Sequence, residues 1–250
     1  MSGHSKWSTI KHRKGAKDAK RSKVFTRLLK EIQVAAKEKG ADQSGNPRLR
    51  LAVLTAKKSS IPKDTIERAI SKGSGAGGND FFELTYHAYA PHGVALIIEC
   101  LTDNQNRVVA NLRSYFSKYG GNLAVNGSVD YLFERKGVFI LNDTGQDADE
   151  LMLQLIEAGL DNADKDGGMI TLTCPLAEYG TLSARLEELK IEVENSELQY
   201  VALTTAKTSV EEAHRVLKLI NKIEDDDDVQ NVFHNLEMSE ELMRDLMTED

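Results

Sequence analysis

The feature of this sequence that most restricts its fold and its function is the separation of its charges. Residues 1–73 carry 19 Lys and Arg against 6 Asp and Glu, a net charge of +13. Residues 74–250 carry 13 against 33, a net charge of −20. Two segments of opposite sign are expected to face different partners, with the basic segment meeting nucleic acid or an anionic membrane surface.

The composition predicts an ordinary soluble protein that stays in the cytoplasm. The 250 residues are 40% hydrophobic and 28% charged, and no apolar run approaches the roughly 20 residues of a membrane-spanning helix. The N-terminus also lacks the apolar centre of a secretory signal. Cys100 and Cys174 both lie in apolar, strand-like runs, so we expect buried free thiols and no disulfide.

The basic segment predicts an arm followed by a small helical bundle. Residues 1–17 contain no acidic side chain and too few apolar ones to form a core. Over residues 18–39, apolar side chains recur at three- and four-residue spacing, which predicts a helix with a buried stripe and a basic stripe. Asn46 and Pro47 resemble the cap and first position of a second helix, and a third helix is predicted from Pro62 to Lys72, ending at Gly73.

A glycine-rich linker over residues 73–80 precedes an acidic segment of alternating strand and helix patterns. Strands are predicted at residues 85–89, 94–101 and 129–133, with a helix over 104–119. The next six elements follow the β-α-β-β-α-β order of ferredoxin-like folds. They are strand 138–141, helix 147–159, strands 160–163 and 169–174, helix 175–189 and strand 191–200. Strand 201–205, helix 210–223 and strand 229–234 follow.

These patterns predict a multidomain α and α+β fold. A small N-terminal helical bundle precedes two α+β domains of ferredoxin-like type, and the second of these is inserted into the first. The predicted domains are 1–78 for the arm and bundle, 79–135 with 201–250 for the discontinuous α+β domain, and 136–200 for the inserted one.

The arm and the start of the first predicted helix form the candidate nucleic-acid interface. Dense basic side chains with an interleaved Trp suit phosphate contacts and stacking on an unpaired base. The predicted contacts are His4, Lys6, Trp7, Lys11, His12, Arg13, Lys14, Lys17, Lys20, Arg21, Lys23 and Arg27. A solvated tail or a membrane-surface segment is the alternative, but the arm lacks the large apolar face of an interfacial helix. No base-reading motif is present, so DNA and RNA both stay open.

Two further segments carry charged clusters. Asp103 or Asn104 is expected to cap a helix, while Arg107 in its first turn opposes the helix dipole and suggests an external anion or carboxylate. Asp103, Asn104 and Arg107 are therefore candidate contacts to a partner. The acidic run Glu224–Asp228 lacks the spacing of a calcium loop, so we predict a solvated acidic loop there.

Nothing in the sequence predicts an enzyme, a cofactor or a metal site. There is no nucleophile and base in a recognisable catalytic order. His87 and His92 are two histidines without a nearby third ligand, which predicts a hairpin turn with exposed rings. The glycines at 73, 75 and 78 match a dinucleotide fingerprint formally, but a helix precedes them, so they are interpreted as a linker.

Several segments together resemble the YebC family, which also includes the mitochondrial translational activator of cytochrome oxidase. They are Gly3-His4-Ser5-Lys6-Trp7, Ile10-Lys11-His12-Arg13-Lys14, Asp18-Ala19-Lys20-Arg21, Asn46-Pro47-Arg48-Leu49-Arg50, Ile97-Ile98-Glu99-Cys100-Leu101, Asp103-Asn104 with Asn106-Arg107, Gly120-Gly121-Asn122-Leu123 and Asp227-Asp228-Val229-Gln230-Asn231-Val232. The resemblance implies three domains, the last inserted in the middle one. Because the pattern begins at Gly3, it favours a bacterial-type cytoplasmic member without a presequence.

The resemblance implies a non-enzymatic regulator of gene expression. Members of that family are described as DNA-binding transcriptional regulators, and others as ribosome-associated translation factors that relieve stalls at proline-rich stretches. We expect the first role, with a ribosome- or rRNA-binding translation factor as the alternative, and a possible protein partner for the acidic domains. The chain departs from the family pattern at His87, Ala88 and Gln105, where an acidic residue, a glycine and an arginine are common.

Overall fold

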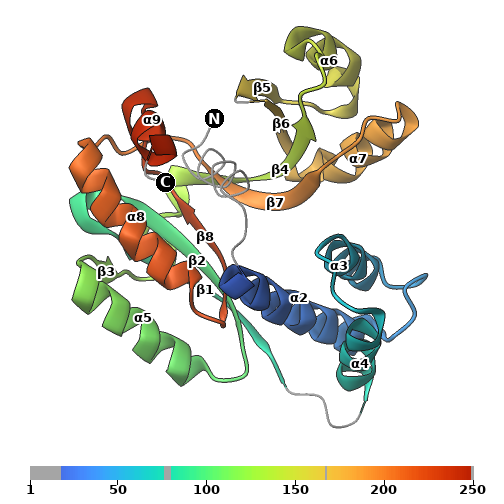
Figure 1. Cartoon of the computed structure of the whole chain (residues 1–250), viewed down its shortest axis with the longest axis horizontal. Helices are drawn as coiled ribbons and strands as arrows, with labels where there is room; N and C mark the ends of the chain where they lie inside the picture. The colour runs from blue at the N-terminus through green and yellow to red at the C-terminus, as the bar shows by residue number, and fades with distance from the viewer. Residues whose placement is uncertain (1–17, 76–79, 167, 249–250) are drawn as a thin grey trace.

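A computed structural model describes residues 18–75, 80–166 and 168–248 of the chain. Over these residues the protein is a mixed α and β structure with two four-stranded antiparallel sheets (Figure 1). Sheet A has the strand order β3-β1-β2-β8, and sheet B has the order β5-β6-β4-β7. The helices α2, α3 and α4 precede both sheets in the chain.

The N-terminal helices form a bundle around their own apolar core. They are α2 (Asp18–Lys39), α3 (Pro47–Lys58) and α4 (Lys63–Ser74). Asn46 caps α3, because its side chain accepts a hydrogen bond from the Leu49 N–H at 3.0 Å and donates one to the Ala35 carbonyl at 2.7 Å. The predicted cap is therefore confirmed, and it ties α3 to α2. Ile32 and Leu49 are fully buried between these helices.

The predicted end of the third helix at Gly73 is wrong. Helix α4 continues through this position to Ser74, and Gly73 is buried against α2. A Cβ atom added at Gly73 would lie 2.2 Å from the carbonyl oxygen of Gln33. Gly73 is therefore needed for the close approach of two helices, a constraint that belongs to the packing and leaves no local signal in the sequence.

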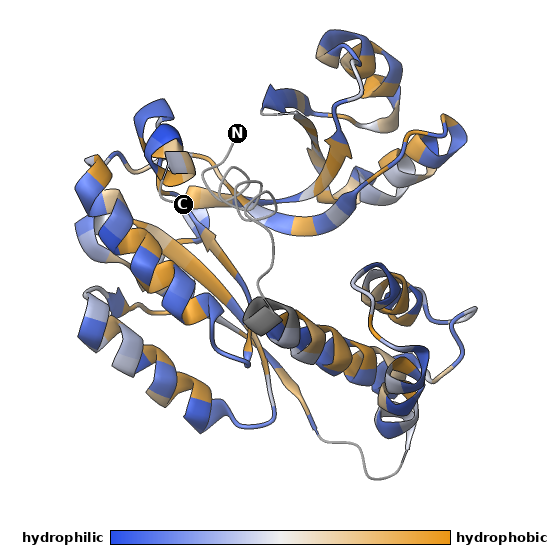
Figure 2. Cartoon of the chain, in the orientation of Figure 1, coloured by the Kyte–Doolittle hydropathy of each residue, from blue (hydrophilic) through white to orange (hydrophobic). Residues whose placement is uncertain are grey.

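Sheet A is covered on one face by two helices. Its strands are β1 (Phe82–Tyr89), β2 (Ala95–Thr102), β3 (Asn122–Leu123) and β8 (Val229–His234), and its helices are α5 (Gln105–Tyr119) and α8 (Val210–Glu224). Leu96, Ile98 and Cys100 alternate along β2 and pack against Leu112 of α5 and Ile220 of α8. Figure 2 shows β2 as largely hydrophobic, while α8 alternates between hydrophobic and hydrophilic residues.

Sheet B contains the predicted β-α-β-β-α-β order. Its elements are β4 (Phe133–Asn142), α6 (Ala148–Leu155), β5 (Asn162–Asp166), β6 (Met169–Pro175), α7 (Tyr179–Glu188) and β7 (Asn195–Ala202). Both helices pack on one face of the sheet, around Phe139, Leu172 and Leu186. Cys174 is buried in this core, and like Cys100 it is a free thiol, as predicted. Burial raises the pKa of the Cys100 thiol to about 12.

The two sheets are connected by the long strands β4 and β7. The predicted boundaries at 135/136 and 200/201 fall inside these strands. The ends of β4 and β7 pack on the second face of sheet A, where Phe133 meets Ile97 and Phe233. The Tyr200 and Phe233 rings lie edge to face with centroids 5.4 Å apart.

Other segments also differ from the predicted pattern. The predicted strand 129–133 is a short 3-10 turn over Asp130–Leu132, and β4 begins only at Phe133. An additional helix, α9 (Glu240–Thr248), buries Leu242 and Leu246 against the core of sheet A. By contrast, the structure reproduces the predicted bounds of the helix over residues 18–39 and of the strand over 229–234.

We predict that Gly73→Ala destabilises the helical bundle by about 1–3 kcal/mol, because the new methyl group meets the Gln33 backbone and not a flexible side chain. Amide hydrogen exchange resolved by helix would show faster exchange in α2 and α4. Gly180→Ala in α7 is the matched control, since its Cβ would meet no atom within 4 Å. Unchanged exchange in Gly73→Ala would contradict the packing argument.

Candidate nucleic-acid interface

Most of the predicted nucleic-acid contacts lie outside the described residues. This applies to His4, Lys6, Trp7, Lys11, His12, Arg13, Lys14 and Lys17. The described backbone begins at Asp18, and the side chains of Lys20 and Arg21 also lie outside the described part. Lys23 and Arg27 are the predicted contacts whose side chains the structure places.

Lys23 and Arg27 contact the acidic run Glu224–Asp228, here called the acidic loop, which connects α8 to β8. The Lys23 ammonium donates to the Asp225 carbonyl at 2.8 Å and lies 2.9 Å from the Asp225 carboxylate. The Arg27 guanidinium donates to the backbone carbonyls of Glu224 and Gln230. Burial lowers the pKa of Arg27 below its ordinary value, although the surrounding carboxylates act in the opposite direction.

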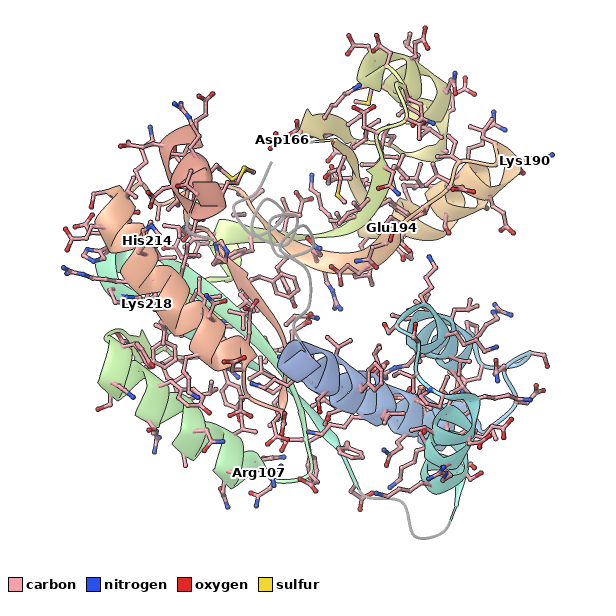
Figure 3. The ribbon with its side chains drawn as sticks, in the orientation of Figure 1. Arg107, Asp166, Lys190, Glu194, His214 and Lys218 are labelled. Carbon is pink, nitrogen blue, oxygen red and sulfur yellow. The ribbon has the colours of Figure 1, made fainter. Side chains whose placement is uncertain are left out.

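One buried carboxylate in the acidic loop accepts hydrogen bonds from two cations. The Lys30 ammonium lies 2.7 Å from the Asp228 carboxylate and also donates to the Asp227 carbonyl at 2.8 Å. Arg107, at the N-terminal end of α5 (Figure 3), donates to both oxygens of Asp228 at 2.8 and 2.9 Å. This paired geometry is the strong form of a guanidinium–carboxylate contact. The side chain of Asp228 is 4% exposed.

The rest of the acidic loop is anchored to α5. The Asp226 carboxylate accepts hydrogen bonds from Asn111 at 2.9 Å and from the Tyr115 hydroxyl at 2.8 Å. Its other oxygen accepts from the Asp228 N–H at 3.0 Å. The acidic loop thus connects α2 to α5 and to sheet A, and we call the full set of these contacts the clasp.

The predicted solvated acidic loop is therefore wrong for Asp226 and Asp228. Side chains from α2 and α5 satisfy these two carboxylates, although the run lies about 200 residues from α2 in the sequence. The i, i+4, i+7 spacing of Lys23, Arg27 and Lys30 was a usable signal, because one helix face offers three cations to a single acidic segment.

The second predicted cluster has an explanation within the chain. Asn104 caps α5, since its side chain accepts a hydrogen bond from the Arg107 N–H at 3.1 Å. The carboxylates that Arg107 contacts are Asp228 and, at 2.8 Å, Asp103. The hydrogen bonds that Arg107 donates to these two carboxylates raise its pKa. The structure thus pairs Arg107 with carboxylates of its own chain, and a partner contact at Asp103, Asn104 and Arg107 stays a prediction.

The hairpin between β1 and β2 does not expose both of its histidine rings, so that prediction is wrong for His87. The His87 ring is buried, and its Nδ1 accepts a hydrogen bond from the Gly127 N–H at 2.7 Å. Its Nε2 lies 3.3 Å from Asp130. His92 has a left-handed backbone, with φ of 63°, and its Nδ1 lies 3.2 Å from Glu212. The two rings therefore have separate structural partners.

The described residues contain neither a candidate metal site nor a helix able to span a membrane. Within residues 18–75, 80–166 and 168–248, no group of three His, Cys, Asp or Glu side chains is arranged to hold a metal ion. In the same part of the chain, no helix combines the length and the apolar composition that crossing a membrane requires.

The fold and the clasp define a class of multidomain protein in which a basic helical segment is joined to an acidic α and β segment. Two family models match this chain, "TACO1/YebC protein N-terminal domain" over residues 5–76 and "TACO1/YebC second and third domain" over residues 81–236. The chain belongs to the TACO1/YebC family, which confirms the resemblance seen in the sequence.

Similar proteins match over almost their whole length. A "Probable transcriptional regulatory protein" of Amoebophilus asiaticus is 48% identical over 239 residues, covering 94% of this chain and 98% of that protein. One from Borrelia turicatae is 48% identical over 244 residues, covering 97% and 100%. The crystal structure of a conserved hypothetical protein, Aq1575 from Aquifex aeolicus, matches with a TM-score of 0.82 at 38% identity, covering 90% of this chain and 94% of that one.

We predict that Asp228→Asn destabilises the protein by about 1–3 kcal/mol, because Lys30 and Arg107 lose a buried counter-charge. Asp225→Asn is the matched control. Its side chain is 49% exposed, so its pair with Lys23 is worth less than about 1 kcal/mol. Urea unfolding of both variants measures the difference, and equal losses would contradict the central place of Asp228 in the clasp.

The clasp also predicts an acid-dependent loss of stability. Burial alone would raise the pKa of Asp228, but hydrogen bonds from Arg107 and Lys30 outweigh it and hold the pKa below its ordinary value. A depressed carboxyl pKa stabilises the fold above the unfolded-state pKa of about 3.9, and this contribution is lost as the pH falls through the folded-state value. Unfolding free energies measured from pH 6 to pH 3 should converge for wild type and Asp228→Asn. A constant difference would contradict the assignment.

Proposed function

We propose that this protein regulates gene expression by binding nucleic acid through residues 1–17 and the first turn of α2. The observation that carries the proposal is the composition of the arm, which has five Lys and Arg, Trp7 and no acidic side chain. Such a segment suits phosphate contacts that need no fixed geometry. The relatives named as probable transcriptional regulatory proteins support a regulatory role.

The clasp narrows the proposed interface. Lys23, Arg27 and Lys30 are engaged by the acidic loop, and the half-buried Arg27 donates to two backbone carbonyls. Withdrawing them would leave charged groups of the loop buried without partners, which is costly. We therefore assign nucleic-acid contact to the arm and the first turn, that is to His4, Lys6, Trp7, Lys11, His12, Arg13, Lys14, Lys17, Lys20 and Arg21. Lys23 and Arg27 are assigned to the clasp.

Transcriptional regulation through DNA is the first candidate function, in line with the names of the relatives. A ribosome- or rRNA-binding translation factor is the second. The observation that favours it concerns α4, the second of two helices joined by a short turn, which would enter the major groove in a helix-turn-helix protein. Helix α4 exposes Asp64 and Glu67 beside Lys63 and Arg68, and such a mixed charge is poorly suited to a groove lined by phosphates.

We predict that Lys11→Glu, Arg13→Glu and Lys14→Glu, combined in one variant, weaken nucleic-acid binding at least about a hundredfold at 150 mM salt, because three phosphate contacts become repulsive. Thermal stability should change little. Fluorescence anisotropy with a duplex DNA and a single-stranded RNA measures both affinities. Charge reversal of Arg113, Lys207 and Lys218, which are exposed in the acidic segment, is the matched control. Unchanged affinity in the arm variant would refute the proposal.

Cross-linking in cells, combined with sedimentation, separates the two candidate functions. Nucleic acid cross-linked to the full chain in cells is recovered and sequenced, and the lysate is sedimented through sucrose. Reads at promoter DNA with the protein free of ribosomes support transcriptional regulation. Reads in rRNA with ribosome co-sedimentation support the translation factor. If about six phosphates are neutralised, affinity should fall roughly a thousandfold between 50 and 200 mM salt in either case.

A further inference from the structure

Helix α3 has an exposed side that combines two leucines with three cations. Leu51 and Leu54 are 50% and 51% exposed, although the opposite side of the same helix is buried in the bundle. Arg50, Lys57 and Lys58 are exposed next to them. The spacing i, i+1, i+4, i+7 and i+8 puts all five side chains on one stripe of a helix. We call this stripe the basic face.

The charges of the basic face are available to a partner. Helix α3 contains no acidic residue. Its ion pairs to other described residues are made by Arg48, which contacts carboxylates of α2 and β1 and lies outside the stripe. Arg50 and Lys57 form no ion pair with a described carboxylate. Lys58 donates to two backbone carbonyls just before β7, at 3.4 and 3.3 Å, and neutralises no carboxylate there.

Helix α6 and its 3-10 continuation η3 (Ile156–Ala158) carry a stripe of the same pattern with the opposite charge. Leu153 and Ile156 are 77% and 56% exposed. Asp149, Glu150 and Glu157 are exposed beside them, and none forms an ion pair with a cation in the described part of the chain. These five positions repeat the i, i+1, i+4, i+7 and i+8 spacing of α3. We call this stripe the acidic face.

The two faces do not meet within one molecule. Figure 1 shows α3 and α6 in separate parts of the structure, with α7 between them. Each helix already packs its other side, α3 in the bundle through Leu49 and α6 on sheet B through Leu155. The exposed apolar side chains are therefore not used by the core of either domain. Adjacent exposed apolar side chains rimmed by charge are typical of a protein–protein contact.

We propose that the basic face of α3 docks on the acidic face of α6 in a second copy of this chain. The faces match when the two helices run antiparallel. The two cations at the C-terminal end of α3 then meet the two carboxylates at the N-terminal end of α6. At the other end, Arg50 meets Glu157. On both helices the end charges are separated by about two turns, roughly 10 Å, so both ends pair at the same time.

The size of the contact favours a twofold dimer. A contact between two helices of about three turns is smaller than the roughly 1,200 Å² of a stable interface. Each copy carries both faces, so a twofold axis makes the same contact twice. Burial of the four apolar side chains in each contact supplies the favourable free energy, and the complementary charges fix orientation and register.

The dimer does not depend on the proposed function, because neither face contains a residue assigned to nucleic acid. It would present two arms on one particle. A nucleic acid long enough to reach both arms would therefore bind more tightly than one that reaches a single arm.

A charge exchange tests the pairing with two double variants of the full chain. The basic-face variant combines Arg50→Glu with Lys57→Glu, and the acidic-face variant combines Glu150→Lys with Glu157→Lys. All four side chains are exposed, so both variants should fold, which circular dichroism checks. The control combines Arg113→Glu with Lys218→Glu, two exposed cations on α5 and α8.

Sedimentation velocity at low salt and increasing protein concentration measures the mass in solution. We expect wild type and control to approach twice the monomer mass. Each face variant alone should stay monomeric, because like charges then face each other. An equal mixture of the two variants should associate at least about tenfold more tightly than either alone, since the two reversed faces meet, as do the two unchanged ones. High salt should weaken association of wild type and mixture.

A wild type that stays monomeric at the highest concentration would overturn the proposal, as would face variants that associate like wild type or a mixture that gains nothing. If wild type is monomeric and the basic-face variant binds a single-stranded RNA more weakly than the control, the basic face belongs to the nucleic-acid interface and a second copy is the wrong occupant.

Discussion

The contact on which the rest of the structure depends is the pairing of the basic face of α2 with the acidic loop. Lys30 and Arg107 converge on Asp228, while Lys23 and Arg27 hold the backbone of the same loop. Burying the Asp228 carboxylate without these cations would be unfavourable, because a buried charge needs a counter-charge. Together they connect the helical bundle to sheet A and fix the point from which the arm leaves. The contact joins residues 202 positions apart, so it is expected to form late in folding.

The clasp divides the cations of the basic segment into two groups with different tasks. Those on α2 neutralise the acidic loop and stabilise the fold, whereas the sequence of the arm contains no acidic side chain. The net charge of +13 over residues 1–73 therefore overstates the charge that is available to a polyanion. In this account the acidic segment holds the base of the arm through the acidic loop. Its negative charge favours selective over indiscriminate binding of polyanions.

The sequence was informative where structure is determined locally. The apolar repeat that defines α2, the cap at Asn46 and the β-α-β-β-α-β order of sheet B all follow from short-range patterns. It was misleading where a contact with a residue far away in the sequence determines the local structure. Gly73 is typical of a helix end until Gln33 is seen against it, and the acidic loop is typical of a solvated turn until α2 is placed beside it. The division at 1–78, 79–135 with 201–250, and 136–200 stays a prediction, because β4 and β7 run through two of its boundaries.

The most direct test of this account is to map the cross-links between the full chain and nucleic acid on the protein side. Ultraviolet cross-linking to a uniform single-stranded RNA and to a duplex, followed by mass spectrometry, identifies the peptides in contact. The account predicts cross-links within residues 1–21, centred on Trp7, and none at Lys23, Arg27 or Lys30, which the acidic loop covers. Cross-links concentrated on that face of α2, with the arm unmodified, would contradict it.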